Sequence, residues 1–72
     1  MRISYDPEVD ALYIRLIDGT HQCRNVRVTD EISLNIGEGE VLVGLEILDA
    51  RATLGHGMAP TVILENVPVV KS

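Results

Sequence analysis

At 72 residues with a formal net charge of -5, the chain is long enough for one small acidic domain. This charge argues against binding to nucleic acid phosphates or to an anionic membrane surface, but it is compatible with a basic protein partner. No apolar run approaches a membrane span of about 20 residues, and the N-terminus lacks a signal-peptide pattern, so we expect a cytoplasmic protein. Cys23 is the only cysteine, and we expect its thiol to be reduced.

The first part of the chain predicts two strands separated by a turn. Residues 2–5 suit a short strand, and residues 11–17 predict the clearest strand because every second residue from Leu12 onward is large and aliphatic. Between them, residues 6–10 read Asp-Pro-Glu-Val-Asp, in which the proline presets φ for a turn.

The middle of the chain predicts two longer strands joined by a glycine turn. Residues 26–36 alternate again, but Asp30 falls on their apolar side and calls for a bulge, a break or an edge position. Residues 37–40, Gly-Glu-Gly-Glu, predict a hairpin turn because glycine reaches positive φ without steric cost. Residues 41–48 are apolar on nearly both sides, which indicates a central position or a face covered by a partner.

A short helix follows the last core strand in this prediction. Asp49 suits the N-cap, the helix starts near Ala50, and Gly55 suits the C-terminal cap. The fold class is therefore α+β and mainly β: an antiparallel meander of about four strands with one short helix. We expect a single β-sheet domain over residues 1–57, and a tail over residues 58–72 that holds a candidate extra strand for its own sheet or for a second copy.

Two segments of the sequence resemble the paired motifs of a known family. Residues 5–14, YDPEVDALYI, fit the pattern YDxxxDxLYI, and residues 44–50 read GLEILDA. The family consists of short, mainly bacterial proteins catalogued only as a domain of unknown function, and the resemblance covers roughly residues 1–54. It implies a small β-sheet with a C-terminal helix, and it brings no established activity and no catalytic residues.

Three carboxylates alternate in the first turn, at Asp6, Glu8 and Asp10. Oxygen ligands at this spacing could hold a hard cation such as Ca²⁺ or Mg²⁺. We favour turn chemistry and solvated charge instead, because Pro7 occupies one gap and no glycine or distal glutamate completes an EF-hand-like loop. We therefore expect no metal and no other cofactor.

Glu46 is a candidate functional carboxylate, because it lies on a nearly apolar strand. A buried carboxylate needs a partner or a raised pKa, and perturbed carboxylates often mark functional sites. The interpretation we favour is an ion pair with Arg15 or Arg27 on the sheet's other face, since structural ion pairs perturb carboxylates as well.

The remaining polar candidates are His21, Cys23 and His56. A Cys–His nucleophile pair normally comes from separate elements and needs a third group to orient it, and the polar loop that carries His21 and Cys23 offers neither. His56 lies between two glycines and is interpreted as a linker residue rather than a metal ligand or a base. We therefore expect no catalytic residue.

The small size of the chain favours an interaction module over an enzyme. A domain this small without a disulfide or a zinc site is close to marginal stability, and oligomerisation is the common remedy. The favoured function is a non-enzymatic module that forms a homodimer and binds a basic partner, in an antitoxin-like or regulatory role. The alternative is a small enzyme or a ligand- or metal-binding protein whose site forms between subunits, with Glu46, Asp6 and Asp10 as the groups to test.

Overall fold

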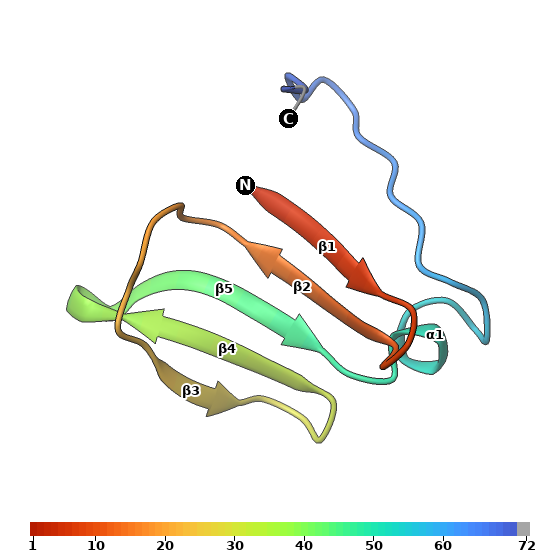
Figure 1. Cartoon of the computed structure of the whole chain (residues 1–72), viewed down its shortest axis with the longest axis horizontal. Helices are drawn as coiled ribbons and strands as arrows, with labels where there is room; N and C mark the ends of the chain where they lie inside the picture. Colours follow the sequence, from red (N-terminus) through yellow and green to blue (C-terminus); the bar gives the residue numbers. More distant parts are fainter. Residues whose placement is uncertain (71–72) are drawn as a thin grey trace.

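A computed structural model describes residues 1–70 as a five-stranded antiparallel sheet, a one-turn helix and an extended C-terminal segment (Figure 1). The elements are β1 (Arg2–Asp6), β2 (Ala11–Arg15), β3 (Arg24–Arg27), β4 (Ile32–Gly37), the 3-10 turn η1 (Glu38–Glu40), β5 (Val41–Ile47) and α1 (Ala50–Thr53). The predicted fold class, an antiparallel and mainly β domain with one short helix after the last strand, is confirmed.

The strands lie in the order β1-β2-β5-β4-β3, so β5 is the central strand. The hairpin β1–β2 and the meander β3–β4–β5 are joined where β2 pairs with β5, and the connection from β2 to β3 runs to the far edge of the sheet (Figure 1). The run that is apolar on nearly both sides thus occupies the middle of the sheet, which is one of the two arrangements that its sequence indicates.

The predicted strand 26–36 is two strands, because residues 28–31 form a turn. The hydroxyl of Thr29 accepts hydrogen bonds from the main-chain N–H groups of Glu31 and Ile32, at 3.2 and 3.0 Å. The turn leaves Asp30 exposed. Of the three arrangements that its position allowed, the chain adopts the break, and the sheet gains a fifth strand.

Strand alternation divides the sheet into two faces, fixed by the register of the four strand pairs. The apolar face carries Ile3, Tyr5, Leu12, Ile14, Val26, Ile32, Leu34, Leu45 and Ile47. The polar face carries Ser4, Tyr13, Arg15, Asn25, Arg27, Ser33, Asn35, Gly44 and Glu46.

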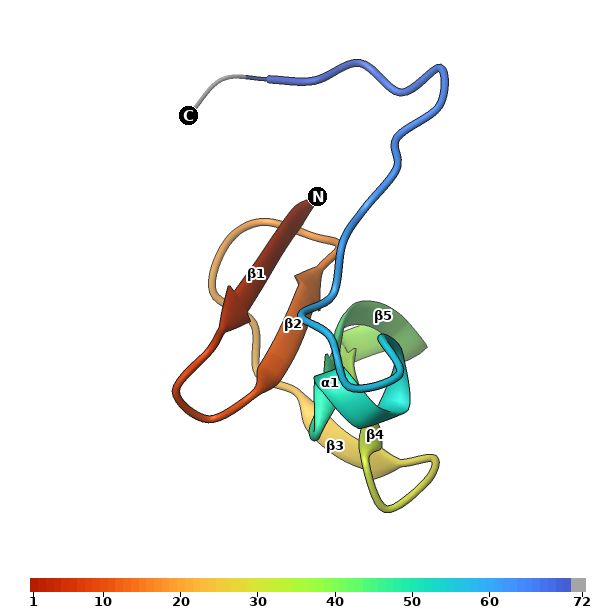
Figure 2. The ribbon, with the colours of Figure 1, turned by 90° about the vertical axis from the view of Figure 1, so that its right-hand side faces the viewer.

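The core lies at one end of the apolar face, under α1. Leu12, Ile47 and Ala50 form the buried cluster, and Tyr5, Ile32 and Leu45 pack against it. Val43 is the only other buried apolar residue among residues 1–70. Figure 2 shows α1 and the start of the tail on this one side of the sheet. The rest of the apolar face stays half-exposed.

The helix is not capped as its sequence predicts. Asp49 adopts left-handed backbone, with φ 47° and ψ 48°, and its side chain makes no capping hydrogen bond within the described chain. The carboxylate of Asp10 takes that role: the N–H of Arg51 donates to its two oxygens at 3.1 and 3.3 Å. The N–H of Ala50 donates to the Asp10 carbonyl at 3.0 Å. Asp49 is the N-cap residue by position, because its carbonyl accepts a hydrogen bond from the N–H of Thr53 at 2.8 Å, but the prediction that its carboxylate caps the helix is wrong. The left-handed backbone of Asp49 makes the turn out of β5.

The C-terminal segment forms no strand within residues 58–70. It passes α1 and then leaves the sheet (Figures 1 and 2). Residues 71 and 72 of the predicted tail lie outside the described residues. No helix among residues 1–70 is long and apolar enough to span a membrane.

Candidate functional site

The carboxylates of the first turn are directed at main-chain and phenol groups. Asp10 Oδ1 accepts a hydrogen bond from the Tyr5 hydroxyl at 2.7 Å, in addition to the helix N–H group described above. Asp6 Oδ1 accepts from the N–H of Glu8 at 2.9 Å, which closes a local turn. In residues 1–70 no three His, Cys, Asp or Glu side chains lie close enough to hold a metal ion. This turn anchors the helix rather than gathering oxygen ligands.

The hydrogen bond from Tyr5 to Asp10 also changes the acidity of the phenol. The neutral phenol donates to the carboxylate, so this bond raises the pKa of Tyr5 above its ordinary value of 10.0, and desolvation adds to the effect. The Arg51 charge acts in the opposite direction and is the weaker influence. Tyr5 therefore holds its proton as part of the helix anchor.

A row of hydrogen bonds crosses the polar face. Asn25 Nδ2 donates to Asn35 Oδ1 at 3.2 Å, and Asn35 Nδ2 donates to the Tyr13 hydroxyl at 3.2 Å. The Tyr13 side chain reaches Asn35 by passing over Gly44, where a Cβ atom would lie 2.7 Å from the phenol oxygen and 2.8 Å from the Ile14 carbonyl oxygen. Glycine at this position of β5 therefore makes room for a contact between β2 and β4.

Glu46 lies on the polar face, between Tyr13 of β2 and Ser33 of β4, and is half-buried. Within residues 1–70, neither Arg15 nor Arg27 forms the expected ion pair with Glu46. Arg15 Nε donates to the carbonyl of Ile17 at 3.1 Å, and Arg27 Nη1 donates to the carbonyl of Asp30 at 2.8 Å. The arginines close turns because they lie near strand ends.

The histidines and the cysteine lie at the surface. The His21 ring is 2.8 Å from the Asp18 carbonyl oxygen, whereas the Cys23 thiol points to the main-chain carbonyl of His21 at 3.7 Å. The ring and the thiol therefore engage different main-chain groups and do not bond to each other. His56 is exposed in the turn after α1, with a positive φ of 52°. A pocket of about 340 Å³ lies beside His21.

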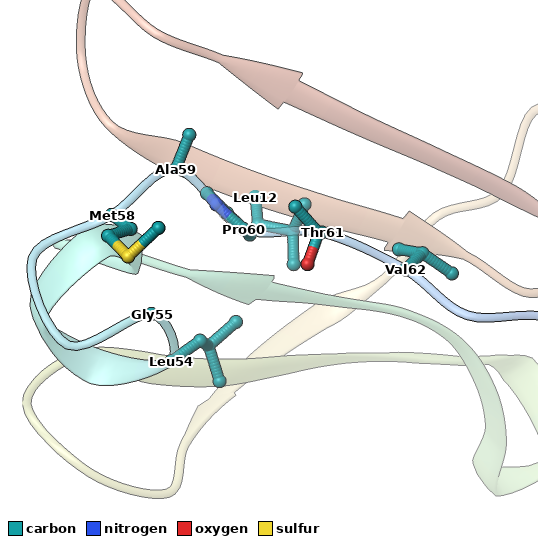
Figure 3. A pocket seen from close by; sticks show the side chains of 8 residues that line it. All are labelled: Leu12, Leu54, Gly55, Met58, Ala59, Pro60, Thr61 and Val62. Carbon is teal, nitrogen blue, oxygen red and sulfur yellow. The ribbon is translucent and has the colours of Figure 1, made fainter.

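An apolar groove of about 360 Å³ lies between the sheet and the C-terminal segment (Figure 3). Its lining residues are Leu12, Leu54, Gly55, Met58, Ala59, Pro60, Thr61 and Val62. Leu12 forms the floor on β2, while the residues after α1 form the walls. Among residues 1–70 this lining contains no charged side chain, and Leu12 belongs to the apolar face, so the groove continues that face.

Residues 2–51 match the family described as "Protein of unknown function (DUF2283)", which is more than half of the chain. The chain belongs to the DUF2283 family. The family resemblance seen in the two sequence segments is thus confirmed. No curated protein and no solved structure matches the chain.

The two motif segments of the DUF2283 region contact each other in the fold. Leu12 pairs with Ile47 in the sheet, and Asp10 binds the main chain of the helix that follows the second segment. The groove in turn joins the DUF2283 region, through Leu12, to the tail that lies outside it. The sequence signal for the Gly44 crossing was visible, since an isolated glycine in a strand often marks a close approach. No sequence signal relates Asp10 to a helix about forty residues away.

Proposed function

We propose that this DUF2283 protein is a non-catalytic interaction module that self-associates through the apolar face of its sheet. The observation that carries the proposal is that the chain itself covers only a small part of this apolar face. A helix of four residues covers one end, and four apolar residues are buried in the described chain. Contiguous exposed apolar surface is uncommon on monomers and generally marks an interaction site.

A second copy is a suitable cover for such a face. Two antiparallel sheets pack face to face at about 10 Å, with the side chains of both inner faces interdigitating. Dimers with twofold symmetry use the same surface patch on both subunits, so one self-complementary apolar face is sufficient. The polar face is less suited to this role, because its Tyr13, Asn35 and Asn25 side chains already bond to one another.

Two lysine substitutions on adjacent residues of β4 test this proposal. Leu34 lies on the apolar face and Ser33 on the polar face, and both are half-buried. We expect light scattering to give about twice the 7.9 kDa chain mass for the wild type and for Ser33→Lys, and the monomer mass for Leu34→Lys. Val26→Lys, on the edge strand β3, is a second apolar-face variant in case Leu34→Lys does not fold. A wild-type chain that stays at 7.9 kDa at micromolar concentration contradicts the proposal.

A basic protein partner is the second part of the proposal, in an antitoxin-like or regulatory role. The turn β1–β2, the turn β3–β4 and the start of α1 lie at one end of the sheet. The carboxylates at this end are Asp6, Glu8, Asp10, Asp30, Glu31 and Asp49. The arginines near them, Arg27 and Arg51, are fewer, so this end contributes much of the net charge of -5.

The binding of such a partner is testable by charge and by salt. A basic protein that copurifies with this chain from its native host is expected to bind more weakly at high salt, because exposed charges are then screened. The double variant Asp30→Asn/Glu31→Gln should weaken binding, whereas Glu38→Gln/Glu40→Gln, at the other end of the sheet, should not. Equal binding by both variants contradicts a role for the acidic end.

A site formed between subunits, the alternative function, receives less support from these positions. Asp6 and Asp10 bind main-chain groups of turns and helix, and Glu46 lies on the polar face. The three carboxylates therefore do not face one space that a second copy would complete through the apolar face.

A further inference from the structure

The outer edge of β1 is open. The N–H of Leu16 donates to the Val43 carbonyl at 2.7 Å. Because the main-chain groups of a strand point alternately to its two neighbours, the even-numbered residues of β2 hydrogen-bond to β5 and the odd-numbered residues hydrogen-bond to β1. In β1 the residues that hydrogen-bond to β2 are therefore the even-numbered ones, and the N–H and C=O groups of Ile3 and Tyr5 point away from the sheet. Within the described chain no main-chain group forms a hydrogen bond with them. Such an edge is a template for one more strand.

The tail contains a segment with the complementary property. We define the tail segment as residues 61–65, Thr-Val-Ile-Leu-Glu, which is rich in β-branched and aliphatic residues. Val62, Ile63 and Leu64 are 54, 86 and 53% exposed. No main-chain hydrogen bond within residues 1–70 involves this segment. It ends before a positive φ of 57° at Asn66, a conformation incompatible with a continuing strand.

We propose that the tail segment of one subunit adds as a sixth strand, antiparallel to β1 of a second copy, with Val62 opposite Tyr5 and Leu64 opposite Ile3. The proposal rests on the self-association proposed above and names the segment that takes part in it. In this register the outward main-chain groups of Ile3 and Tyr5 gain partners. Val62 and Leu64 lie beside them on the apolar face, which they extend.

Charge favours this direction and this register. The antiparallel arrangement places Glu65 opposite Arg2, and opposite charges on facing strands stabilise a pair. A parallel arrangement with the same apolar contacts places Glu65 opposite Asp6, where like charges repel. A slip of one residue moves Glu65 onto the apolar face, because side chains alternate with period two.

A second copy is a better acceptor than the subunit's own edge. The turn after α1 is held by hydrogen bonds from the N–H of Gly57 to the Arg51 carbonyl, at 2.7 Å, and from the N–H of Met58 to the Gly55 carbonyl, at 3.0 Å. This turn sends the tail over Leu12, on the face of β2 rather than alongside β1 (Figure 3). A second copy can present its edge to the tail without that constraint, and twofold symmetry forms the pairing twice.

A disulfide between two chains tests the pairing directly. In the proposed register Ser4 faces Ile63 in a non-hydrogen-bonded pair, for which Cα atoms are about 4.5 Å apart, within the range of about 4.4 to 6.8 Å for disulfides. In a Cys23→Ser background, full-length chains with Ser4→Cys and with Ile63→Cys are mixed and oxidised, and one chain is isotopically labelled. We expect the mixed disulfide dimer to exceed both like-with-like dimers by mass spectrometry.

Val70→Cys is the matched control for Ile63→Cys, because the two side chains are 87 and 86% exposed. Equal yields of mixed dimer from both positions overturn the register. If the Ser4→Cys/Ile63→Cys chain forms an internal disulfide and the single variants form no mixed dimer, pairing between two copies is overturned. The tail segment then pairs with β1 of its own subunit. A dimer by light scattering that forms no mixed disulfide overturns this inference alone, whereas a monomer overturns the self-association on which it rests.

Discussion

The two faces of this sheet are built from the same strands but differ in how far one chain completes them. On the polar face, side chains of β3, β4 and β2 bond in a row, Asn25 to Asn35 and Asn35 to Tyr13, and Gly44 leaves space for the row to cross β5. On the apolar face, α1 covers one end and the remaining aliphatic side chains are half-exposed. Hydrogen bonds between neighbouring strands need only the sheet itself, whereas burial of an apolar face needs a second layer.

The chain has little material for that second layer. It contains no Phe and no Trp, and its helix is one turn long. The apolar residues after the helix run away from the sheet rather than across all of it (Figure 2). The chain thus completes its polar face by itself, whereas it buries only the part of the apolar face that lies under α1.

The largest effect is expected where the polar face is tightest, at Gly44. Gly44→Ala places a Cβ atom 2.8 Å from the Ile14 carbonyl oxygen and 2.7 Å from the Tyr13 phenol oxygen. Because one of these groups is main chain and cannot move alone, we expect a loss of about 3 kcal/mol in the free energy of unfolding, at the upper end for overpacking. Denaturant unfolding measures it. A Tyr13→Ala background should reduce the loss without removing it. A loss below about 1 kcal/mol would show that this face accommodates the added Cβ atom without a clash.

How much of this fold the sequence predicts depends on the range of the interactions involved. Alternation predicts the strands, because it depends on neighbouring residues. The run that is apolar on nearly both sides predicts either the central place that β5 takes or a face covered by a partner. Asp30 indicates a bulge, a break or an edge position, but it does not indicate which of the three the chain adopts. The contacts of Asp10 with α1 and of Tyr13 with Asn35 join residues that are far apart in the chain, so no local pattern predicts them.

A smaller effect is expected from the anchor that holds the cover of the apolar face. Asp10 and Asp49 both have positive φ, at 55° and 47°, so Asp→Gly relieves the same backbone strain at both positions. Of these two carboxylates, only that of Asp10 accepts hydrogen bonds within residues 1–70, from Tyr5 and from the main chain of α1.

We therefore expect Asp10→Gly to lower the free energy of unfolding by about 2 kcal/mol, because it removes a helix cap and a charged hydrogen bond. Asp49→Gly should leave the free energy of unfolding unchanged or raise it slightly. Thermal or denaturant unfolding of the two variants compares them directly. Equal losses would mean that the carboxylate of Asp10 does not anchor the helix.

The smallest effect is expected from pH, through the same anchor. The hydrogen bond to Asp10 raises the pKa of Tyr5 above its ordinary value of 10.0. At a pH between 10.0 and the pKa of the folded state, the folded chain therefore holds a proton that the unfolded chain has released. The stabilisation is therefore complete below pH 10 and is lost as the pH rises through the pKa of the folded state. We expect the thermal midpoint to fall in alkaline solution for the wild type and to fall less for Tyr5→Phe. Asp10→Gly should also weaken the dependence, because it removes the cause of the shift, whereas Tyr13→Phe, on the polar face, should retain it. If Tyr5→Phe keeps the full alkaline dependence, the phenol does not link the helix to the first turn.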